Sequence, residues 1–470
     1  MSLFRKKEIA TLVRGTEQTA LRKTLGATDL VLLGIGCIIG TGIFVLTGVA
    51  AATYAGPGIM LSFVLSGLAC AFAALAYSEL AAMVPVTGSA YTFVYVAMGE
   101  IVAFAVGWAL ICEYTIGSAA VAAGWSGYMV GLLKSAGIVL PKTWTAVPAD
   151  GGILNVPAVL ITGLLTYLLM LGTRESAALN RILVFIKLVC IAFFLFVATP
   201  HVDPVHWQPF LPFGWSGVAA GAAIVFFAYI GFDTVSTAVE ECKNPNRDVP
   251  IGIVGSLVIC TVLYIAVAAV LTGVVPYSTL NNSEPVAYAL RAIGMNFGSA
   301  LVALGAICGI TTVLLVFMYG QTRVFLAMAR DGMIPQSLVK IHPRYGTPHI
   351  ITLLAGCVVS VLSGLLPINI IAELCNMGTL FAFILVALGV GVLRRTQPDA
   401  SRPFRCPAVG VVVPMAVLLC GYLIANLPVQ TMEFFGAWYV VGMIVYFTYS
   451  RKHSTLNTKV GGGPEQAGRQ

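Results

Sequence analysis

Four glycines stand within nine residues in the stretch GIGCIIGTGIF, at positions 34–44, inside an apolar run. Glycine in a helix interior costs about 1 kcal/mol relative to alanine, so this spacing predicts backbone that stops being helical. A break leaves the amides of Thr41, Gly42 and Ile43 without partners at the start of a new half-helix, where the helix dipole favours an anion. The stretch therefore predicts a site for a carboxylate.

A second apolar stretch, FFAYIGFDTVS, is interrupted at Gly231. The carbonyl groups that end the half-helices before the two breaks, at Ile38, Phe227 and Ile230, carry negative partial charge and favour an ammonium group. Two opposite poles a few ångströms apart fit the α-carboxylate and α-amino group of one amino acid. Together the stretches predict a binding site for a zwitterion.

The glycines of the first stretch have other interpretations. Gly36 and Gly40 form a GxxxG pattern, which is typical of close helix packing in membranes. With Gly34 they also approach the GxGxxG pattern of dinucleotide-binding loops, but no strand-loop-helix context surrounds them. Close packing is therefore the main alternative to a binding site.

Lys187 lies in the apolar run RILVFIKLVCIAFF, about 10 residues into the predicted span 177–199 and therefore about 15 Å deep at the rise of an α-helix. A lone ammonium group at that depth costs several kcal/mol unless it has a partner. We predict that Lys187 lies beside the first break and exchanges a proton, in the place that a coupling cation would otherwise hold. A permanent tether to backbone carbonyl groups is the alternative.

Two acidic residues also lie inside apolar runs. Glu113 either faces the predicted cavity, where it would influence side-chain choice or proton traffic, or bonds to a neighbouring helix. Asp233 follows the second break, where an aspartate is a common N-cap, and a gating or coupling role is its alternative. Three further carboxylates receive no predicted role: Glu79, Glu373 and Glu433.

Membrane-spanning helices must position these residues. Of the 470 residues, 59% are hydrophobic and 10% charged, whereas a soluble domain carries roughly 25% charged residues. A span needs about 20 apolar residues. The sequence predicts an all-α integral membrane protein with twelve spans, near residues 27–50, 57–83, 99–132, 154–172, 177–199, 215–240, 250–274, 298–328, 349–365, 369–393, 410–427 and 431–449.

The distribution of positive charge predicts the orientation. The net charge is +7, and most of the 26 Lys and Arg residues fall in segments that share one side if the N-terminus is inside. We therefore predict a multi-pass protein of the plasma (inner) membrane, surrounded by lipid, with both termini cytoplasmic and no nucleic-acid partner. The eleven cysteines and five histidines show no metal-ligand spacing, so no metal or other cofactor is expected.

The order of the spans predicts an inverted repeat. Residues 27–200 hold five spans and residues 201–393 hold five more, so the second set starts from the opposite side of the membrane. Residues 394–450 add two spans, residues 1–26 form a cytoplasmic segment, and residues 451–470 form a polar tail that we expect to be disordered. Both repeats open with an interrupted helix, which points to a transporter site.

Several motifs resemble the amino acid–polyamine–organocation (APC) superfamily, and within it the cationic amino acid transporter family and its bacterial relatives. The resemblance covers about residues 27–450 and is carried by GIGCIIGTGIF, YSELAAMVPVTGSAYTF, FFAYIGFDTVSTAVEECKNPNRDVP, ARDGMIP with HPRYGTPH, and SRPFRCP. It implies a LeuT-like fold of two inverted five-helix repeats, with alternating access around a central amino acid.

The resemblance also implies roles for individual residues. Thr41 and Gly42 would hold the substrate carboxylate. The carbonyls of Ile38, Phe227 and Ile230 would receive its amino group, and the Phe227 ring would close over the substrate from outside.

By the same resemblance, Lys187 matches the fifth-span lysine that sodium-independent members carry in place of a sodium ion, so H⁺ is the expected coupling ion. Met318 is expected to line the pocket, and an apolar lining disfavours an unsolvated guanidinium. Glu113 could supply a counter-charge. We expect small neutral amino acids such as alanine, with arginine and lysine as an open alternative.

The predicted function is proton-coupled import of L-amino acids by a secondary active transporter, not catalysis. An amino acid exchanger is an open alternative, because it would use the same cavity, and so is a sensor that binds without transport. A channel would need charged rings or symmetric carbonyl loops, which the sequence lacks. A membrane enzyme would need a catalytic constellation, which is also missing.

Overall fold

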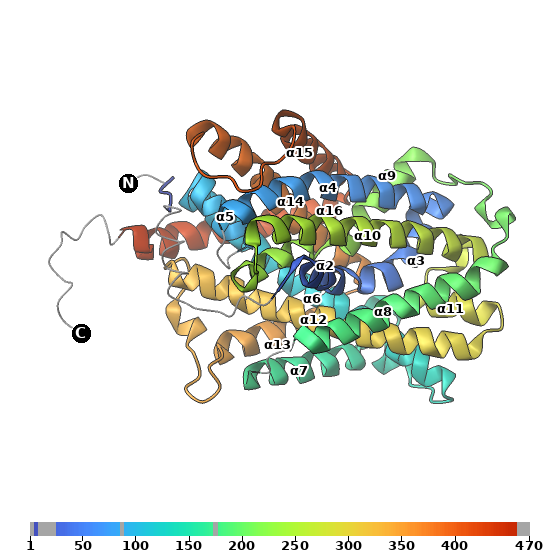
Figure 1. Ribbon diagram of the computed structural model, residues 1–470. Helices are drawn as coiled ribbons and strands as arrows, with labels where there is room; N and C mark the ends of the chain where they lie inside the picture. Colours follow the sequence, from blue (N-terminus) through green and yellow to red (C-terminus); the bar gives the residue numbers. More distant parts are fainter. Residues whose placement is uncertain (1–3, 8–24, 85–88, 173–176, 458–470) are drawn as a thin grey trace.

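The computed structural model describes residues 4–7, 25–84, 89–172 and 177–457. Within these ranges all regular secondary structure is helical. There is no β-strand in them, although Leu25 and Cys242 form one isolated β-bridge. Most of the long helices run side by side along the length of a single bundle (Figure 1).

The α-helices fall into long and short groups. The longer ones are α4 (Ile59–Met83), α6 (Glu100–Ser135), α8 (Ala177–Ala198), α10 (Pro245–Val274), α12 (Asn296–Arg330) and α14 (Ile368–Thr396). The shorter ones are α2 (Ala27–Ile38), α3 (Thr47–Ala50), α5 (Ser89–Met98), α7 (Val156–Leu171), α9 (Gly214–Val225), α11 (Pro285–Ala292), α13 (His349–Leu365), α15 (Val409–Ala425), α16 (Val429–Val445) and α17 (Arg451–His453).

Eight helical segments of the described residues are long and apolar enough to cross a membrane: Gly42–Met83, Glu100–Ser135, Arg181–His201, Gly214–Ser236, Pro245–Val274, Asn296–Arg330, Ile368–Thr396 and Val429–His453. The other expected spans correspond to shorter apolar helices or to parts of these segments.

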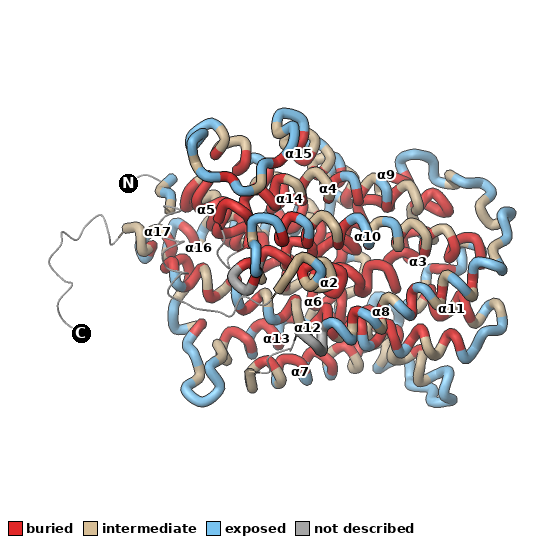
Figure 2. Tube along the Cα trace, in the orientation of Figure 1, coloured by how far each residue is buried: buried red, intermediate tan, exposed pale blue. Residues whose placement is uncertain are grey.

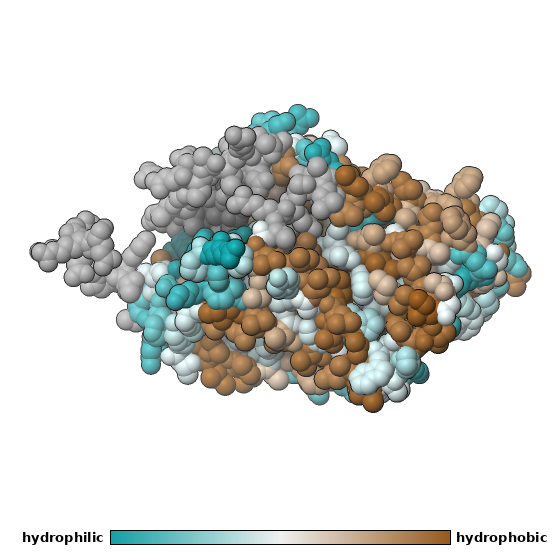
Figure 3. Space-filling model, turned by 90° about the horizontal axis from the view of Figure 1, so that it is seen from below, coloured by the Kyte–Doolittle hydropathy of each residue, from teal (hydrophilic) through white to brown (hydrophobic). Residues whose placement is uncertain are grey.

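The outside of the bundle is apolar along its length. Large side chains such as Leu160, Phe185 and Val262 are more than half exposed. Apolar residues cover much of the face shown in Figure 3, and buried backbone fills the middle of the bundle in Figure 2. A water-soluble protein rarely exposes so continuous an apolar surface, so this flank is suited to lipid.

The first span is interrupted where its glycines predict. Helix α2 ends at Ile38, and Ile39 takes an extended conformation with ψ 105°. The chain then turns helical again, first as a π-helical turn over Gly42–Leu46 and then as α3. The glycines that weaken the α-helix here thus mark a true break.

The sixth predicted span is interrupted as well. Helix α9 passes into a 3₁₀ turn, Phe226–Tyr229, and Ile230 is extended. Gly231 has φ +119°, a conformation that residues with a Cβ rarely adopt, and a 3₁₀ helix over Phe232–Glu241 follows. This turn therefore favours glycine, because other residues rarely adopt such a positive φ.

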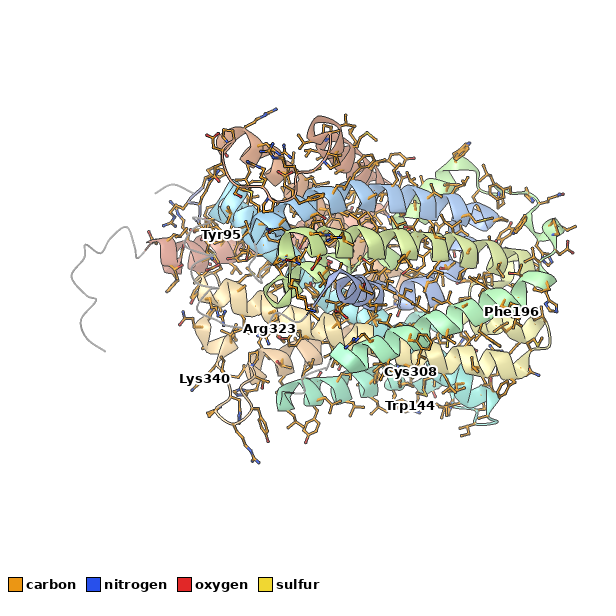
Figure 4. All side chains as sticks on the ribbon, in the orientation of Figure 1. Tyr95, Trp144, Phe196, Cys308, Arg323 and Lys340 are labelled. Carbon is orange, nitrogen blue, oxygen red and sulfur yellow. The ribbon has the colours of Figure 1, made fainter. Side chains whose placement is uncertain are left out.

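The two described ends of the chain meet at one end of the bundle, which we call the terminal end (Figure 1). Arg5 donates to Glu100 at 3.2 Å and to Asn457 at 3.1 Å. Lys7 pairs with Asp331 at 2.6 Å. Figure 4 places Arg323 and Lys340 toward this end and Phe196 toward the other.

The expected terminal segments are only partly described. Residues 8–24 of the N-terminal segment 1–26 and residues 458–470 of the expected tail lie outside the described ranges. Within residues 451–457, Arg451–His453 form α17 and Asn457 accepts the bond from Arg5.

A buried charge cluster fixes the connection between α14 and α15 at the terminal end. The Glu79 carboxylate accepts two bonds from Arg394, at 2.8 and 2.7 Å, and one from the Cys406 amide at 2.8 Å. Arg402 lies 3.3 Å from the same carboxylate and donates to carbonyls at the end of α14. This cluster gives a structural role to Glu79, for which the sequence suggested none.

Candidate substrate-binding site

The two interrupted spans touch each other through their backbones. A Cβ built on Gly42 would lie 2.3 Å from the Cα of Ala228, and one built on Gly231 would lie 2.9 Å from the carbonyl oxygen of Cys37. The absence of a side chain at Gly42 and at Gly231 therefore allows the two breaks to lie in contact. Gly40 of the GxxxG pattern also lies close to another helix, because a Cβ there would meet Val313 of α12 at 3.0 Å, so close packing and a break do not exclude each other in this stretch.

The helix ends that the sequence predicts to bind the carboxylate and the ammonium group lie where the two breaks meet, which we call the junction. Thr41, Gly42 and Ile43 occupy the first turn after the first break, where the leading amides have no preceding turn to bond. Ile38 ends α2, and Ile230 follows the 3₁₀ turn that contains Phe227. The arrangement brings amide and carbonyl ends of half-helices together in the interior of the bundle.

The side chains at the junction are closed off from solvent. Ile38, Ile43, Phe227 and Ile230 are 1–5% exposed. Thr41 is 1% exposed, and its hydroxyl lies 3.5 Å from the carbonyl oxygen of Val121 on α6. The predicted substrate residues are therefore buried in the interior of the bundle.

Met318 is also buried, at 2% exposure, on α12. The same helix reaches the first break through Val313, which would meet a Cβ on Gly40 at 3.0 Å. The ring of Phe317 packs edge-on against Tyr114 of α6, with centroids 5.7 Å apart. Helix α12 thus packs against the first break through Val313 and against α6 through Phe317.

Lys187 reaches the last turn of α2 from α8. Its Nζ donates to the carbonyl oxygen of Gly36 at 2.7 Å, and the residue is fully buried. A Cβ on Gly309 of α12 would lie 2.9 Å from its Cγ, so the aliphatic stem fits against a helix without a side chain at that point. A cation at a helix C-terminus is favourable, because the carbonyl end of the dipole is negative.

Glu113 contacts a neighbouring helix. Its carboxyl group interacts with the Thr379 hydroxyl of α14, and its Cβ lies near Gly378. Its Oε2 is buried without a hydrogen-bond partner among the described residues.

Asp233 is not the N-cap that we expected after the second break. The 3₁₀ helix begins at Phe232, so its N-cap is Gly231, which has a positive φ. Asp233 lies in the first turn instead, 3% exposed, and its carboxylate accepts backbone N–H bonds there, including that of Thr234. It therefore binds helix-start amides from inside the helix.

Two side chains that bond to the backbone at or near the breaks could not be identified from the sequence. The Tyr264 hydroxyl of α10 lies 3.0 Å from the Ile38 carbonyl and 2.9 Å from the Ala228 carbonyl, so it bridges both breaks. Asn376 of α14 donates to the carbonyls of Ala223 and Ile224 at the end of α9. A lone tyrosine or asparagine in an apolar run carries no local signal of such a role.

Within the described ranges, no three His, Cys, Asp or Glu side chains gather closely enough to hold a metal ion. The site consists of backbone poles, apolar side chains and a few buried polar groups. Such a site can bind and orient a small zwitterion.

Comparison with known proteins identifies the family. The family model described as amino acid permease matches residues 25–449. The branched-chain amino acid permease of Bacillus subtilis (strain 168) is 49% identical over 462 residues, covering 97% of this chain and 99% of that protein. The methylthioribose transporter of the same strain is 46% identical over 458 residues, with the same coverage. Cationic amino acid transporter 4 of Homo sapiens is 39% identical over 395 residues, covering 82% of this chain and 62% of that protein.

The family match includes both interrupted helices and Lys187. The relatives are named as permeases and transporters, not as enzymes. The chain therefore belongs to the amino acid permease family of the APC superfamily and is a membrane transporter.

Proposed function

We propose that this transporter imports small neutral L-amino acids by alternating access. The observation that carries the proposal is the backbone contact between Gly42 and Ala228, which joins the two broken helices. Amide ends there would hold the substrate carboxylate, and the carbonyls of Ile38, Phe227 and Ile230 would hold its ammonium group. The buried arrangement of these residues would then be one state of the transport cycle.

The fold that we propose for this function is the LeuT-like arrangement of two inverted five-helix repeats plus two further helices. The shorter apolar helices and the two parts of the first span would complete twelve spans. The terminal end would face the cytoplasm of a plasma-membrane protein, since Arg323 and Lys340 lie toward it (Figure 4).

Proton coupling is proposed through Lys187. Its ammonium group donates to the Gly36 carbonyl and so places a positive charge beside the first break. Loss of the proton would weaken that bond and free the end of α2 to move. A sodium ion is not needed in this scheme, because the ammonium group supplies the positive charge.

A second candidate is preference for branched-chain amino acids. It is favoured by the relatives of Bacillus subtilis and Lactococcus lactis that are named branched-chain amino acid permeases, at 49% and 35% identity. The bulk of Met318 and the Phe227 ring favours the smaller side chain of alanine.

Uptake into proteoliposomes tests the proposal. Purified protein is reconstituted with no amino acid inside, and labelled alanine, leucine, valine or arginine is added outside with an inward proton gradient. We expect alanine to accumulate most strongly and an uncoupler to abolish its accumulation. Stronger uptake of leucine and valine would select the second candidate, and stronger uptake of arginine would contradict both.

The same vesicles separate import from exchange. An importer fills empty vesicles, whereas an obligate exchanger works only when amino acid is loaded inside. Empty vesicles that stay empty despite the gradient would refute the proposed proton-driven import. A sensor would bind alanine without any uptake in either preparation.

A further inference from the structure

A groove on the flank of the bundle lies away from the substrate-binding site. It is a shallow groove that is largely open to its surroundings, with a volume of about 560 Å³. It lies between α4, α10 and the connection before α15, which the Glu79 cluster holds at the terminal end. Its lining residues are Leu75, Pro250, Ile251, Val254, Gly255, Phe404, Arg405 and Pro407.

The walls of this groove suit a hydrocarbon chain. All but one of the lining side chains are apolar or absent, and Ile251 is 40% exposed on the α10 wall. Gly255 leaves the same wall without a side chain one turn further on. A polar solute would gain nothing from this lining, whereas an acyl chain would remove apolar surface from contact with other lipids and fill the hollow.

The polar residue of the lining is Arg405, which is exposed. Its guanidinium makes no hydrogen bond or ion pair with any residue in the part of the chain that the structure describes. Arg394 and Arg402, which lie nearby in the sequence, differ because they are bound by Glu79. Arg405 therefore presents an unneutralised positive charge at the edge of an apolar groove.

A second arginine extends this positive edge. Arg247 is exposed and lies four residues before Ile251 on α10, so the two side chains share one face of the helix. The neighbouring Asp248 is buried, and its carboxylate accepts the Asn244 amide at 3.3 Å. The groove thus has an apolar body and a cationic rim.

We propose that this groove binds one anionic phospholipid from the leaflet at the terminal end. An acyl chain would lie along Ile251 and Val254, and the phosphate would contact Arg405 and Arg247. Bidentate contact between arginine and phosphate gives the site its preference for charge. A zwitterionic headgroup fits less well, because its ammonium group opposes the cationic rim.

Native mass spectrometry of the delipidated full-length protein tests the site. Phosphatidylglycerol or phosphatidylcholine is titrated into the detergent-solubilised protein, and the bound fraction is measured. We expect phosphatidylglycerol to bind more tightly, and R405Q to weaken its binding about fivefold, the factor for one arginine near a charged lipid. R247Q/R405Q is expected to remove most of the preference.

Two further variants keep the test specific. R330Q removes an exposed arginine at the end of α12, a helix that contributes no residue to the groove, and is expected to bind phosphatidylglycerol like the wild type. I251W fills the groove from an exposed position and is expected to reduce binding of both lipids. Equal binding of the two lipids by the wild type, or equal losses in R405Q and R330Q, would overturn the proposal.

Discussion

Gly42 and Ala228 stand in backbone contact, although 186 positions separate them: a Cβ on Gly42 would lie 2.3 Å from the Ala228 Cα and 2.9 Å from its amide nitrogen. No side chain fits between two backbones at that distance. The first and sixth predicted spans can therefore meet only while residue 42 is glycine, and the proposed substrate site depends on this contact.

Gly42→Ala is expected to push the broken helices apart. Overpacking of a tight interior costs about 1–3 kcal/mol, and the displaced poles should lower alanine uptake by on the order of tenfold or more. Uptake and thermal unfolding of the purified variant measure both effects. Gly421→Ala on α15 is the matched control, since nothing lies within 4 Å of a Cβ there. Equal uptake by the two variants would contradict the proposed importance of the contact.

Tyr264→Phe is expected to loosen the link between the two breaks. The change keeps the ring but leaves the carbonyls of Ile38 and Ala228 without this donor, which costs about 1–3 kcal/mol in a buried site. We expect a lower unfolding temperature and slower uptake. Tyr422→Phe, at an exposed position, serves as the control. An unchanged unfolding temperature for Tyr264→Phe would show that the bridge contributes nothing.

Lys187→Met is expected to uncouple transport from the proton gradient. Methionine keeps the aliphatic stem that lies against Gly309 but removes the ammonium group on the Gly36 carbonyl. Accumulation driven by a pH gradient should vanish, while exchange of labelled for unlabelled alanine should persist. Lys340→Met changes an exposed lysine and should leave both assays unaltered. Gradient-driven uptake in Lys187→Met would refute the coupling role.

Glu79→Gln is expected to be strongly destabilising. The change leaves Arg394 and Arg402 without their shared carboxylate, and breaking a buried ion pair from one side costs about 3–5 kcal/mol. Thermal unfolding measures the loss. Glu433→Gln, at an exposed position on α16, should cost within about 0.5 kcal/mol. Similar unfolding temperatures for the two variants would mean that the cluster does not hold the α14–α15 connection.

The Glu284–Arg291 pair predicts a pH dependence of stability. Burial raises the pKa of the Glu284 carboxyl group above its ordinary value of 4.5, although Arg291 opposes the shift. The folded state then binds this proton more tightly than the unfolded state does. This contribution to stability is present below pH 4.5 and is lost as the pH rises through the folded-state pKa.

Unfolding temperatures of the wild type and Glu284→Gln across this pH range test the sign. The wild type should lose stability relative to the variant as the pH rises above 4.5, because the variant cannot titrate at this position. A difference that grows in favour of the wild type would mean that the pairing with Arg291 outweighs burial.

The breaks could be predicted from the sequence because their cause is local. Glycine weakens a helix wherever it occurs, and the two interruptions lie within two residues of Gly40 and Gly231, respectively. The form of the restarted segments could not be predicted in the same way. The π-helical turn Gly42–Leu46 and the 3₁₀ helix Phe232–Glu241 depend on how tightly the two backbones pack.

The links between distant helices escaped prediction for a related reason. Tyr264 lies 226 positions from Ile38, and Arg394 lies 315 positions from Glu79. A buried polar side chain signals that it needs a partner but not which one. The assignment of Asp233 as an N-cap was wrong because the positive φ at Gly231 shifts the helix start by two residues.

The terminal end has one further consequence. Arg5 and Ser454 share the carboxylate of Glu100, and Lys7 and the Thr455 amide both bind Asp331. Residues close to the two ends of the described chain therefore bind the same two acidic residues of the bundle. Spin labels near positions 4 and 457 should keep one short separation while the contacts to Glu100 and Asp331 are formed. A second, longer distance should appear if these contacts break when the terminal end opens.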